Sequence, residues 1–193
     1  MVILKPGIKV LMLELLLVLI FLRFSVLLVS LLLLLMIFTL IFFRDPKRRI
    51  EDGIISPADG KIDYIDKNRI EIFMGPLDAH VNLAPVSGIV KDIKDEGRKI
   101  IPAFIRSKKA KRKEIIIENE HGKFKLTLVA GFIARRIICL VEKGKKVDKG
   151  QKIGMIIFGS RVILEIPAGF KFTKKVGEKV KAGQTLAIKL DKC

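Results

Sequence analysis

The first 43 residues are predominantly apolar, and their pattern predicts helix. Residues 26–43 form an apolar run that only Ser30 and Thr39 interrupt. With a rise of about 1.5 Å per residue, a helix of this length nearly spans a hydrocarbon layer of about 30 Å. The run is therefore typical of a segment that lies in a membrane.

A second, shorter apolar run occupies residues 10–22, carries Glu14 and is separated from the first by Arg23. The two runs are compatible with a helical hairpin that turns near Arg23, with one long or tilted span, and with two helices lying partly in the membrane interface. We favour the hairpin or a re-entrant pair. A cleavable signal peptide fits poorly, because the apolar region is too long and lacks a small-residue cleavage site. Since a carboxylate is costly in lipid, Glu14 is expected to need a partner, protonation or a shallow position.

The basic stretch RDPKRR follows the apolar region directly, at residues 44–49. Basic residues beside a membrane segment tend to remain in the cytoplasm. We therefore expect residues 1–43 to anchor the chain in the cell membrane. Residues 44–193 are expected to form a domain on the cytoplasmic side.

Short β-branched runs bounded by Gly, Pro or Asp replace the helical pattern from Ile50 onward. They are KIDYI, RIEIFM, GIVKDI, EIIIE and KFKLTLVAGFIARRIICLVE. Such runs at short intervals predict strands, and hence a mainly-β domain of the sandwich or barrel type.

Two internal repeats refine this expectation. Residues 144–153 and 177–186 share the pattern G-x-K-V-x-x-G-Q-x-(I/L), and residues 57–62 and 85–90 share P-x-x-G-x-(I/V). These patterns resemble the hammerhead-like, barrel-sandwich architecture of biotinyl and lipoyl carrier domains. That resemblance concerns architecture and carries no chemistry.

Each copy of the longer repeat predicts a strand end, a turn and a further strand. Val147 and Val180 are expected to be buried. Gly150 and Gly183 are expected to adopt backbone angles that other residues avoid.

The net charge of +17 calls for an acidic partner or a strongly solvated surface. Nucleic acid is the first candidate, but the lysines are spread along strands and turns, and the sequence has no aromatic-rich stacking platform or recognition motif. Anionic lipid headgroups suit a basic domain held at a membrane better, so we expect lipid and no nucleic acid. Cys139 and Cys193 lack metal-type spacing, and we expect neither a metal site nor a disulfide.

Three residues could together activate a hydroxyl: Asp59 in SPADGKI, His80 in GPLDAHVNLAPVSGIV and Ser160 in MIIFGSRVILEIP. An acid, an imidazole and a serine can form such a set wherever the fold brings them together. Ser160 stands between Gly159 and Arg161, where a strand-to-strand turn would more often use Asn-Gly or Asp-Gly. Because the G-x-S-x-G motif is absent, conventional serine hydrolysis is disfavoured.

The two histidines of the chain have different settings. His121, in ENEHGKF, is typical of a hairpin turn. His80 lies in an apolar segment punctuated by proline, where a buried structural histidine is the alternative to a functional one. We expect the neighbouring Asp78 to be a turn or capping residue that holds His80.

Several motifs, in order along the chain, resemble those of the pyruvoyl-dependent phosphatidylserine decarboxylases. They are FFRDPKR, SPADGKI, GPLDAHVNLAPVSGIV, ENE, VAGFIARRIICLVEKG and KGQKIGMIIFGSRVILEIP. The closer match is the short prokaryotic class, which includes archaetidylserine decarboxylases. The likeness extends from about Phe42 to the C-terminus and so covers nearly the whole predicted β domain.

The resemblance implies a membrane-associated proenzyme that cleaves itself between Gly159 and Ser160. The Ser160 hydroxyl would attack the Gly159 carbonyl, and the resulting ester would break down to leave a covalent pyruvoyl group on residue 160. The β chain, residues 1–159, and the α chain, residues 160–193, would stay together as a heterodimer, and a higher oligomer is left open. The pyruvoyl group would form a Schiff base with the headgroup amine of phosphatidylserine or archaetidylserine. Carbon dioxide and the ethanolamine lipid would be released without a metal.

The resemblance also implies residue roles. Ser160 would be the pyruvoyl precursor, and Asp59 the acidic member of the self-cleavage triad. His80 matches the first histidine of the pattern D-x-H-x-x-H-x-P, which the family links to decarboxylation. The second histidine of that pattern falls on Leu83, a departure that the short class shares, so the identity of the cleavage base stays open. We expect His80 to serve both steps.

Arg135 and Arg136 lie side by side in the apolar run FIARRIICLV. One outward charge and one paired charge would explain them structurally. A planar guanidinium also suits a phosphate or carboxylate, so either residue could bind the substrate.

A non-enzymatic, membrane-anchored adaptor resembling a biotinyl or lipoyl carrier is the alternative to an enzyme. It would explain the repeats and the apolar N-terminal region. It gives no reason for Gly159–Ser160 between two strands, nor for His80. Whether the substrate carries ester- or ether-linked tails, and which group donates the final proton, stay open at this point.

Overall fold

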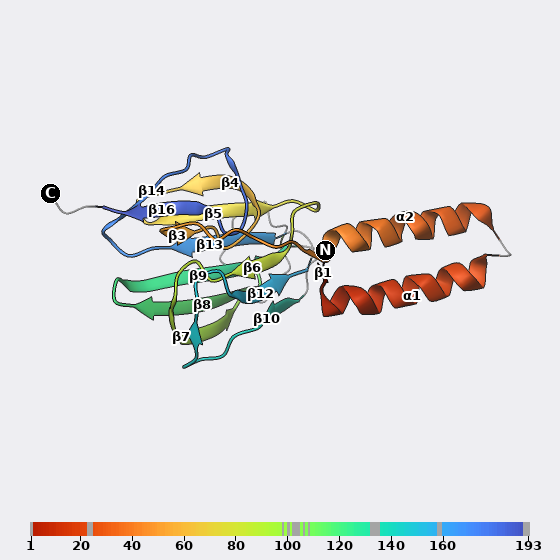
Figure 1. Cartoon of the computed structure of the whole chain (residues 1–193), viewed down its shortest axis with the longest axis horizontal. Coiled ribbons are helices and arrows are strands. Elements are labelled where there is room, and N and C mark those ends of the chain that lie inside the picture. The colour runs from red at the N-terminus through yellow and green to blue at the C-terminus, as the bar shows by residue number, and fades with distance from the viewer. Residues whose placement is uncertain are drawn as a thin grey trace. The chain divides into compact units, whose positions relative to one another are not determined.

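The structure, a computed structural model, describes most of the chain. The described residues are 2–22, 25–97, 99, 101, 105, 107, 109–131, 136–157 and 160–190. They divide into two compact units, Met1–Lys47 and Arg48–Cys193, which Figure 1 colours along the chain. The division falls close to the expected boundary after residue 43.

The first unit is a helical hairpin. Helices α1 (Lys5–Phe21) and α2 (Val26–Phe42) pack against each other, and strands β1 (Val2–Ile3) and β2 (Arg44–Asp45) pair at their open end. Two packed helices agree with the favoured prediction of a hairpin or a re-entrant pair, whose place in a membrane stays a prediction; Arg23, near which the turn was expected, lies outside the described residues. Glu14 has the partner it was expected to need, because the Thr39 hydroxyl donates a hydrogen bond of 2.9 Å to its carboxylate.

The outer surface of this hairpin is apolar. Its exposed large apolar residues are Ile8, Val10, Met12, Leu13, Leu15, Leu16, Leu19, Ile20, Leu22, Val26, Leu27, Leu31, Leu33, Leu34, Leu35, Ile37 and Ile41. Over the residues that the structure describes, neither helix combines the length and the apolar character needed to cross a membrane.

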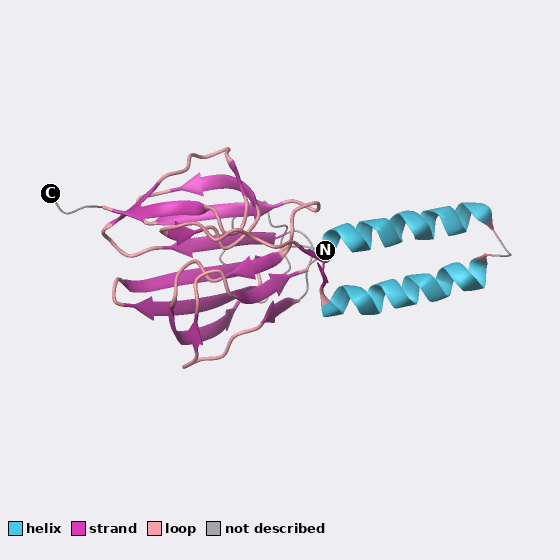
Figure 2. Cartoon of the chain, viewed as in Figure 1, coloured by secondary structure: helices cyan, strands magenta, loops and turns pink. Residues whose placement is uncertain are grey.

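The second unit is built from strands, as Figure 2 shows, and the prediction of a mainly-β domain is confirmed. Its strands are β3 (Ile54–Ile55), β4 (Gly60–Ile65), β5 (Arg69–Met74), β6 (Val81–Leu83), β7 (Gly88–Glu96), β8 (Arg112–Asn119), β9 (Gly122–Ala130), β10 (Ile137–Cys139), β11 (Lys146–Val147), β12 (Lys152–Ile156), β13 (Ser160–Glu165), β14 (Phe170–Phe172), β15 (Lys179–Val180) and β16 (Thr185–Lys189).

The strand orders of the sheets reveal two matched halves. The large sheet has the order β11-β7-β8-β9-β13-β5-β4-β15, and the two small sheets have the orders β10-β12-β6 and β14-β16-β3. Counted inward from the two edges of the large sheet, β11, β7, β8 and β9 correspond to β15, β4, β5 and β13. The strands of the two small sheets correspond in the order in which they are given. The first half consists of β3, β4, β5, β13, β14, β15 and β16, and the second half of β6 to β12 in sequence.

The sequence repeats mark equivalent places in these halves. Val147 pairs with Gly88, and Val180 pairs with Gly60, so each long repeat meets one copy of the shorter P-x-x-G repeat. Both valines are buried, as predicted. Each repeat turn also bonds its own glutamine side chain to a backbone amide, at 3.0 Å in the second half and 2.8 Å in the first.

The predicted turn glycines are confirmed. Gly150 has a φ of +83° and Gly183 a φ of +96°, in the left-handed region that side chains disfavour. Each glycine donates a 3.0 Å hydrogen bond to the matching carbonyl, that of Ala84 or that of Ser56.

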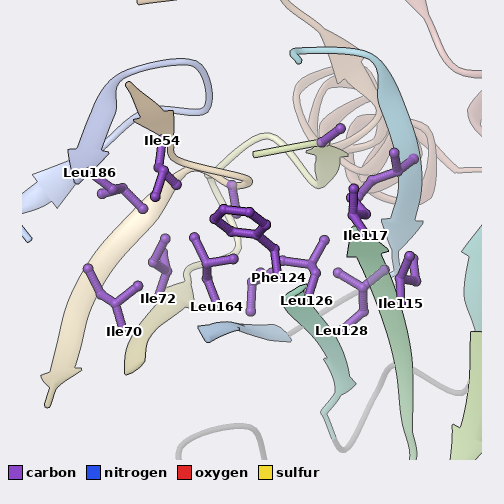
Figure 3. Close-up of a cluster of buried hydrophobic side chains, with 14 of the residues drawn as sticks. Ile54, Ile70, Ile72, Ile115, Ile117, Phe124, Leu126, Leu128, Leu164 and Leu186 are labelled. Atoms are coloured by element: carbon purple, nitrogen blue, oxygen red, sulfur yellow. The ribbon is translucent and has the colours of Figure 1, made fainter. Parts of the chain in front are cut away.

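The core lies between the large sheet and the small ones. Ile70 and Ile72 of β5 match Ile115 and Ile117 of β8, and Figure 3 shows all four in one buried cluster with Phe124. Burying an aliphatic or aromatic side chain contributes about 1.5–3 kcal/mol. The alternation of these residues along their strands is the pattern that predicted the strands.

The chain passes between the halves at one place. It leaves the first half after β5, builds the whole second half, and returns at β13. Strands β5 and β13 nevertheless pair side by side, Met74 against Ser160 through Arg69 against Glu165.

Candidate functional site

Ser160 stands where the chain re-enters the first half. It is the first residue of β13, a central strand between β5 and β9, and it pairs with Met74 on one side and Ala130 on the other. Both partners are buried members of the core cluster. Gly159 lies outside the described residues.

The corresponding place in the second half is an ordinary hairpin. In the first half, the pair Met74–Ser160 lies two residues along the strands from the pair Ile72–Val162. In the second half, Asn119–Gly122 lies two residues along from the equivalent pair, Ile117–Phe124. Ser160 therefore matches Gly122, which closes the two-residue turn between β8 and β9. Ser160 begins a strand at the place where the second half has a turn glycine. This explains why the Gly-Ser-Arg sequence lacks the usual turn residues.

His80 approaches this place from the chain segment after β5. Its side chain is fully buried, and its Nδ1 lies 2.7 Å from the Asp78 carbonyl oxygen. A carbonyl only accepts hydrogen bonds, so Nδ1 is the donor and Nε2 carries the basic lone pair of the neutral ring. The His80 carbonyl accepts a 3.3 Å hydrogen bond from the amide of Ile156, four residues before Ser160. His80 is therefore held by its ring to the turn after β5 and by its backbone carbonyl to the end of β12, the strand that precedes Ser160.

Asp78 has the turn role expected of it. Its carboxylate accepts a 2.7 Å hydrogen bond from the amide of Gly75, directly after β5. Its backbone carbonyl orients the imidazole of His80. The turn therefore connects the strand that pairs with Ser160 to the buried histidine.

Asp59 is buried at the start of β4, one strand beyond β5. Its carboxylate forms an ion pair with Arg48 and accepts a 2.9 Å hydrogen bond from the amide of Ala182. Because strands in a sheet lie about 4.8 Å apart, two strand spacings separate β4 from β13. In the structure Asp59 is thus engaged with the repeat turn and with Arg48.

The second half supplies a counterpart for this contact. Ser87 occupies the position of Asp59 in the P-x-x-G repeat, and its hydroxyl accepts a 2.8 Å hydrogen bond from the amide of Lys149. Capping the turn amide is therefore common to both halves. The negative charge and the pairing with Arg48 are specific to the first half.

Arg161, the residue after Ser160, forms a buried ion cluster. Its side chain is about 4 % exposed, and its guanidinium bonds Glu71 of β5 and, at 2.9 Å, Asp63 of β4. Arg69 donates a second hydrogen bond to Glu71, at 2.6 Å. These residues bind the beginning of β13 to its neighbour β5 and, through Asp63, to β4, the next strand of the sheet.

The electrostatics of Glu71 follow from this cluster. Burial raises the pKa of its carboxyl. The hydrogen bond and charge of Arg161, joined by those of Arg69, outweigh burial and bring the pKa below its ordinary value of 4.5. Glu71 is therefore held as a carboxylate at neutral pH.

The two arginines considered for substrate binding are placed differently. Arg135 lies outside the described residues. Arg136 is exposed, and its carbonyl accepts a 3.4 Å hydrogen bond from the amide of Ile157, just ahead of the Gly159–Ser160 bond. The segment between β9 and β10 that contains both arginines is longer than its counterpart between β13 and β14.

Sequence reasoning missed the ion cluster. Glu71 interrupts the apolar alternation of RIEIFM, and a charged residue inside a strand-like run is a signal for a buried pair. Arg161 was visible beside Ser160. Its partners were not, because Glu71 is 90 positions away along the chain.

The described residues contain no cluster of three or more His, Cys, Asp and Glu side chains that could hold a metal ion. What they do contain is a serine at the start of a central strand, a buried and oriented imidazole on the segment that follows the neighbouring strand β5, and a buried ion cluster that anchors the strand. A serine, an imidazole and buried charges are groups that enzymes use for nucleophilic and acid–base chemistry.

Comparison with known proteins identifies the family. Residues 35–188 match the family model of phosphatidylserine decarboxylase, and the chain belongs to this family. No solved structure matches the chain significantly.

Curated relatives agree with this assignment. A protein of Archaeoglobus fulgidus, provisionally named as an archaetidylserine decarboxylase proenzyme, is 54 % identical over 79 % of this chain and 78 % of its own length. A Methanosarcina mazei protein with the same provisional name is 44 % identical over 76 % of this chain and 72 % of its own. The phosphatidylserine decarboxylase proenzyme of Chlorobaculum tepidum is 39 % identical over 78 % of this chain and 77 % of its own.

These matches confirm the resemblance and the prediction of an enzyme. The chain is a carboxy-lyase of the decarboxylase proenzyme family. The alternative of a non-enzymatic adaptor receives no support.

Proposed function

We propose that the chain decarboxylates the serine headgroup of phosphatidylserine or archaetidylserine, after cutting itself between Gly159 and Ser160. The observation that carries the proposal is the pairing of residue 160 with Met74 and Ala130 where the chain re-enters the first half, with the buried His80 on the segment that follows β5. Residues 1–159 become the β chain and residues 160–193 the α chain. The two remain a heterodimer, because β13 is paired on both sides.

Self-cleavage requires the Ser160 oxygen to attack the carbonyl carbon of Gly159. As the oxygen–carbon bond forms, the carbon–nitrogen bond of the peptide breaks, and the hydroxyl proton ends on the freed nitrogen of Ser160. His80 Nε2 is the base that carries this proton. Glycine at 159 offers no side chain to obstruct the attack, and flanking strands that hold the reactants close can contribute several kcal/mol.

The second stage converts Ser160 into the pyruvoyl group. Loss of the α-proton expels the Gly159 carboxylate, and water then replaces the nitrogen, which leaves as ammonia. The residues present fit a small keto group at position 160. The paired neighbours Met74 and Ala130 are apolar, and the segment that follows β5 carries the buried imidazole of His80, oriented by the Asp78 carbonyl. When formed, the keto group supplies an electron sink for loss of carbon dioxide from the headgroup.

The protein residues have separate tasks in the proposed reaction. His80 holds and moves protons at Nε2, in self-cleavage and in decarboxylation. Asp59 supports the site indirectly, by joining Arg48 to the turn at Ala182. Arg136, exposed beside Ile157, and Arg135 bind the phosphate of the headgroup.

Membrane attachment is part of the proposal. The apolar surface of the helical hairpin suits the acyl or isoprenoid layer, and its helices of 17 residues reach about 25 Å without needing to cross it. The RDPKRR stretch and the basic β domain lie at the cytoplasmic face, against anionic headgroups. The paired repeat turns support a hammerhead-like arrangement similar to that of biotinyl and lipoyl carrier domains.

Intact-mass analysis tests the cleavage. Purified wild-type protein should yield a fragment of residues 160–193 whose N-terminus is blocked and reacts with a carbonyl reagent. The Ser160→Ala chain should stay whole. A wild-type chain that remains whole and inactive after membrane reconstitution would overturn the proposal.

Vesicles test the substrate. Wild-type protein should release carbon dioxide from vesicles of phosphatidylserine or of archaetidylserine, and the faster reaction identifies the natural tails. His80→Gln, which keeps a hydrogen-bonding side chain but no base, should abolish release. Release from neither lipid by a fully cleaved protein would refute the lipid assignment while leaving self-cleavage intact.

A further inference from the structure

Asn82 is a polar residue at a position where the fold calls for an aliphatic one. It is the middle residue of β6, is fully buried and pairs with Gly154 of β12. The matched position in the first half is Ile54 of β3, which pairs with Ala187 of β16 with the same irregularity in register. Ile54 belongs to the core cluster.

The face on which Asn82 lies is the interior one. A Cβ added to its partner Gly154 would approach Leu128 Cδ1, in the core cluster, to 3.0 Å. Directly paired residues project to the same side of a sheet. The carboxamide of Asn82 therefore lies among apolar side chains.

Its hydrogen bonding is incomplete. Nδ2 lies 3.9 Å from the sulfur of Met74, a weak acceptor, and Oδ1 has no hydrogen-bond partner among the described residues. A buried polar atom left in this way destabilises the folded state, because it has lost its hydrogen bond to water without gaining one in the protein. Exchange of the two amide atoms would not remove the deficit, because the thioether sulfur of Met74 has no proton to donate to an amide oxygen. An isoleucine, as in the other half, would remove this cost.

The location of the carboxamide explains why the residue is polar. Met74, which it touches, is the cross-strand partner of Ser160. His80 lies two residues before Asn82 on the same extended segment and is tied by its carbonyl to Ile156. Asn82 and His80 are thus the two fully buried polar side chains of this segment, and Asn82 contacts the residue that pairs with Ser160.

We propose that Asn82 is a positioning residue for self-cleavage. Its Oδ1 accepts a hydrogen bond from the Ser160 hydroxyl and holds that oxygen against the carbonyl carbon of Gly159, until the imidazole of His80 takes the proton. This inference rests on the proposed function.

The test compares Asn82→Leu with Asn82→Asp. Leucine has the same branched side chain of four heavy atoms as asparagine, with no hydrogen-bonding atom, whereas aspartate keeps an acceptor oxygen. Self-cleavage of freshly synthesised protein is followed by intact mass at several pH values. Unfolding of each variant is measured in urea in the uncleaved Ser160→Ala background. Ile54→Leu is the matched control, since it alters the equivalent core position far from the crossing.

We expect Asn82→Leu to slow self-cleavage about a hundredfold, the effect of losing a well-held reactant geometry, while its urea midpoint stays equal to that of the parent or rises. Asn82→Asp should restore much of the rate, and that rate should increase with pH as the acceptor becomes a carboxylate. Ile54→Leu should be cut at the wild-type rate. A purely structural asparagine would behave oppositely, with stability and cleavage falling together.

The outcomes separate this inference from the proposed function. Wild-type protein that is never cut between Gly159 and Ser160 overturns both. Wild-type protein that is cut, with Asn82→Leu cut equally fast, overturns only the role of Asn82. The same holds if Asn82→Leu slows cleavage but loses stability to the same degree as it loses rate.

Discussion

The β8–β9 and β5–β13 strand pairs occupy equivalent places in the two halves of the fold, but the chain connects their strands in different ways. In the second half a two-residue turn joins Asn119 to Gly122. In the first half the chain leaves at Met74, and the paired residue Ser160 follows only after the entire second half has been built. A cut at a hairpin turn would free a short connection. A cut ahead of Ser160 instead creates a chain end that two neighbouring strands hold in register.

Buried charge follows the same division. Arg161 and Glu71 form a buried pair in the first half, whereas the matched residues of the second half are Lys123, which is largely exposed, and Ile116. Asp59 with Arg48 likewise matches the uncharged Ser87. The backbone pattern is shared, and buried charge is added in the half that contains Ser160. If the chain is cut as proposed, these ion pairs would hold β13 in place.

The largest expected difference between the halves concerns Arg161. Arg161→Met would leave the carboxylate of Glu71 buried with Arg69 as its remaining cation, and we expect a loss of about 3–5 kcal/mol in unfolding free energy. Lys123→Met at the matched position removes a surface pair worth about 0–1 kcal/mol. Urea unfolding in the Ser160→Ala background measures both. Equal losses would show that the cluster does not distinguish the halves.

The turn caps give the next effect. Asp59→Ala removes the partner of Arg48 and the acceptor for the Ala182 amide, so we expect a loss of about 3 kcal/mol, against about 1 kcal/mol for Ser87→Ala. The same urea series measures these values. Asp59→Asn in the cleavable chain then separates the roles. Retained cleavage with reduced stability supports the indirect role, and complete loss of cleavage at unchanged stability would contradict it.

The repeat glycines provide a finer contrast. Both require positive φ, so Gly150→Ala and Gly183→Ala should each cost about 1–2 kcal/mol. A Cβ at 183 would also meet the Arg49 carbonyl oxygen at 2.5 Å, whereas one at 150 would meet the Ile50 Cδ1 at 2.6 Å. The tip of the Ile50 side chain can shift at little cost in free energy, whereas moving the backbone carbonyl of Arg49 costs more. Gly183→Ala should therefore have the lower thermal midpoint, and the reverse order would break the equivalence of the turns.

The smallest expected effect is a pH dependence confined to the first half. Because the pKa of Glu71 lies below its ordinary value of 4.5, its stabilising contribution is complete above that value and is lost as pH falls through the lowered pKa. Glu71→Gln should flatten this acid limb of the stability curve in the Ser160→Ala background. Ile116→Val, at the matched position, should leave its shape unchanged. If the unfolding free energy of Glu71→Gln still falls as steeply with decreasing pH, other carboxyls cause the loss of stability in acid.

The sequence by itself determined the local features of this protein. Alternating β-branched residues predict the strands, because a pleated strand exposes its faces in turn. The repeated glycines predict the turns, because few other residues accept a positive φ. The apolar N-terminal runs predict a helical hairpin, and the ordered motifs indicate the decarboxylase family.

Only the tertiary structure decided which of these elements meet. Nothing local to Ser160 indicates that Met74 lies beside it, or that Gly122 is its counterpart in a hairpin. The residues around Arg161 do not indicate that Glu71 is its partner. Those around Asp59 do not indicate its contact with Ala182, which is 123 positions away. Strand pairing over such separations depends on how the two halves close around one core, and a charge or an amide acquires its partner only when that closure brings distant strands into register.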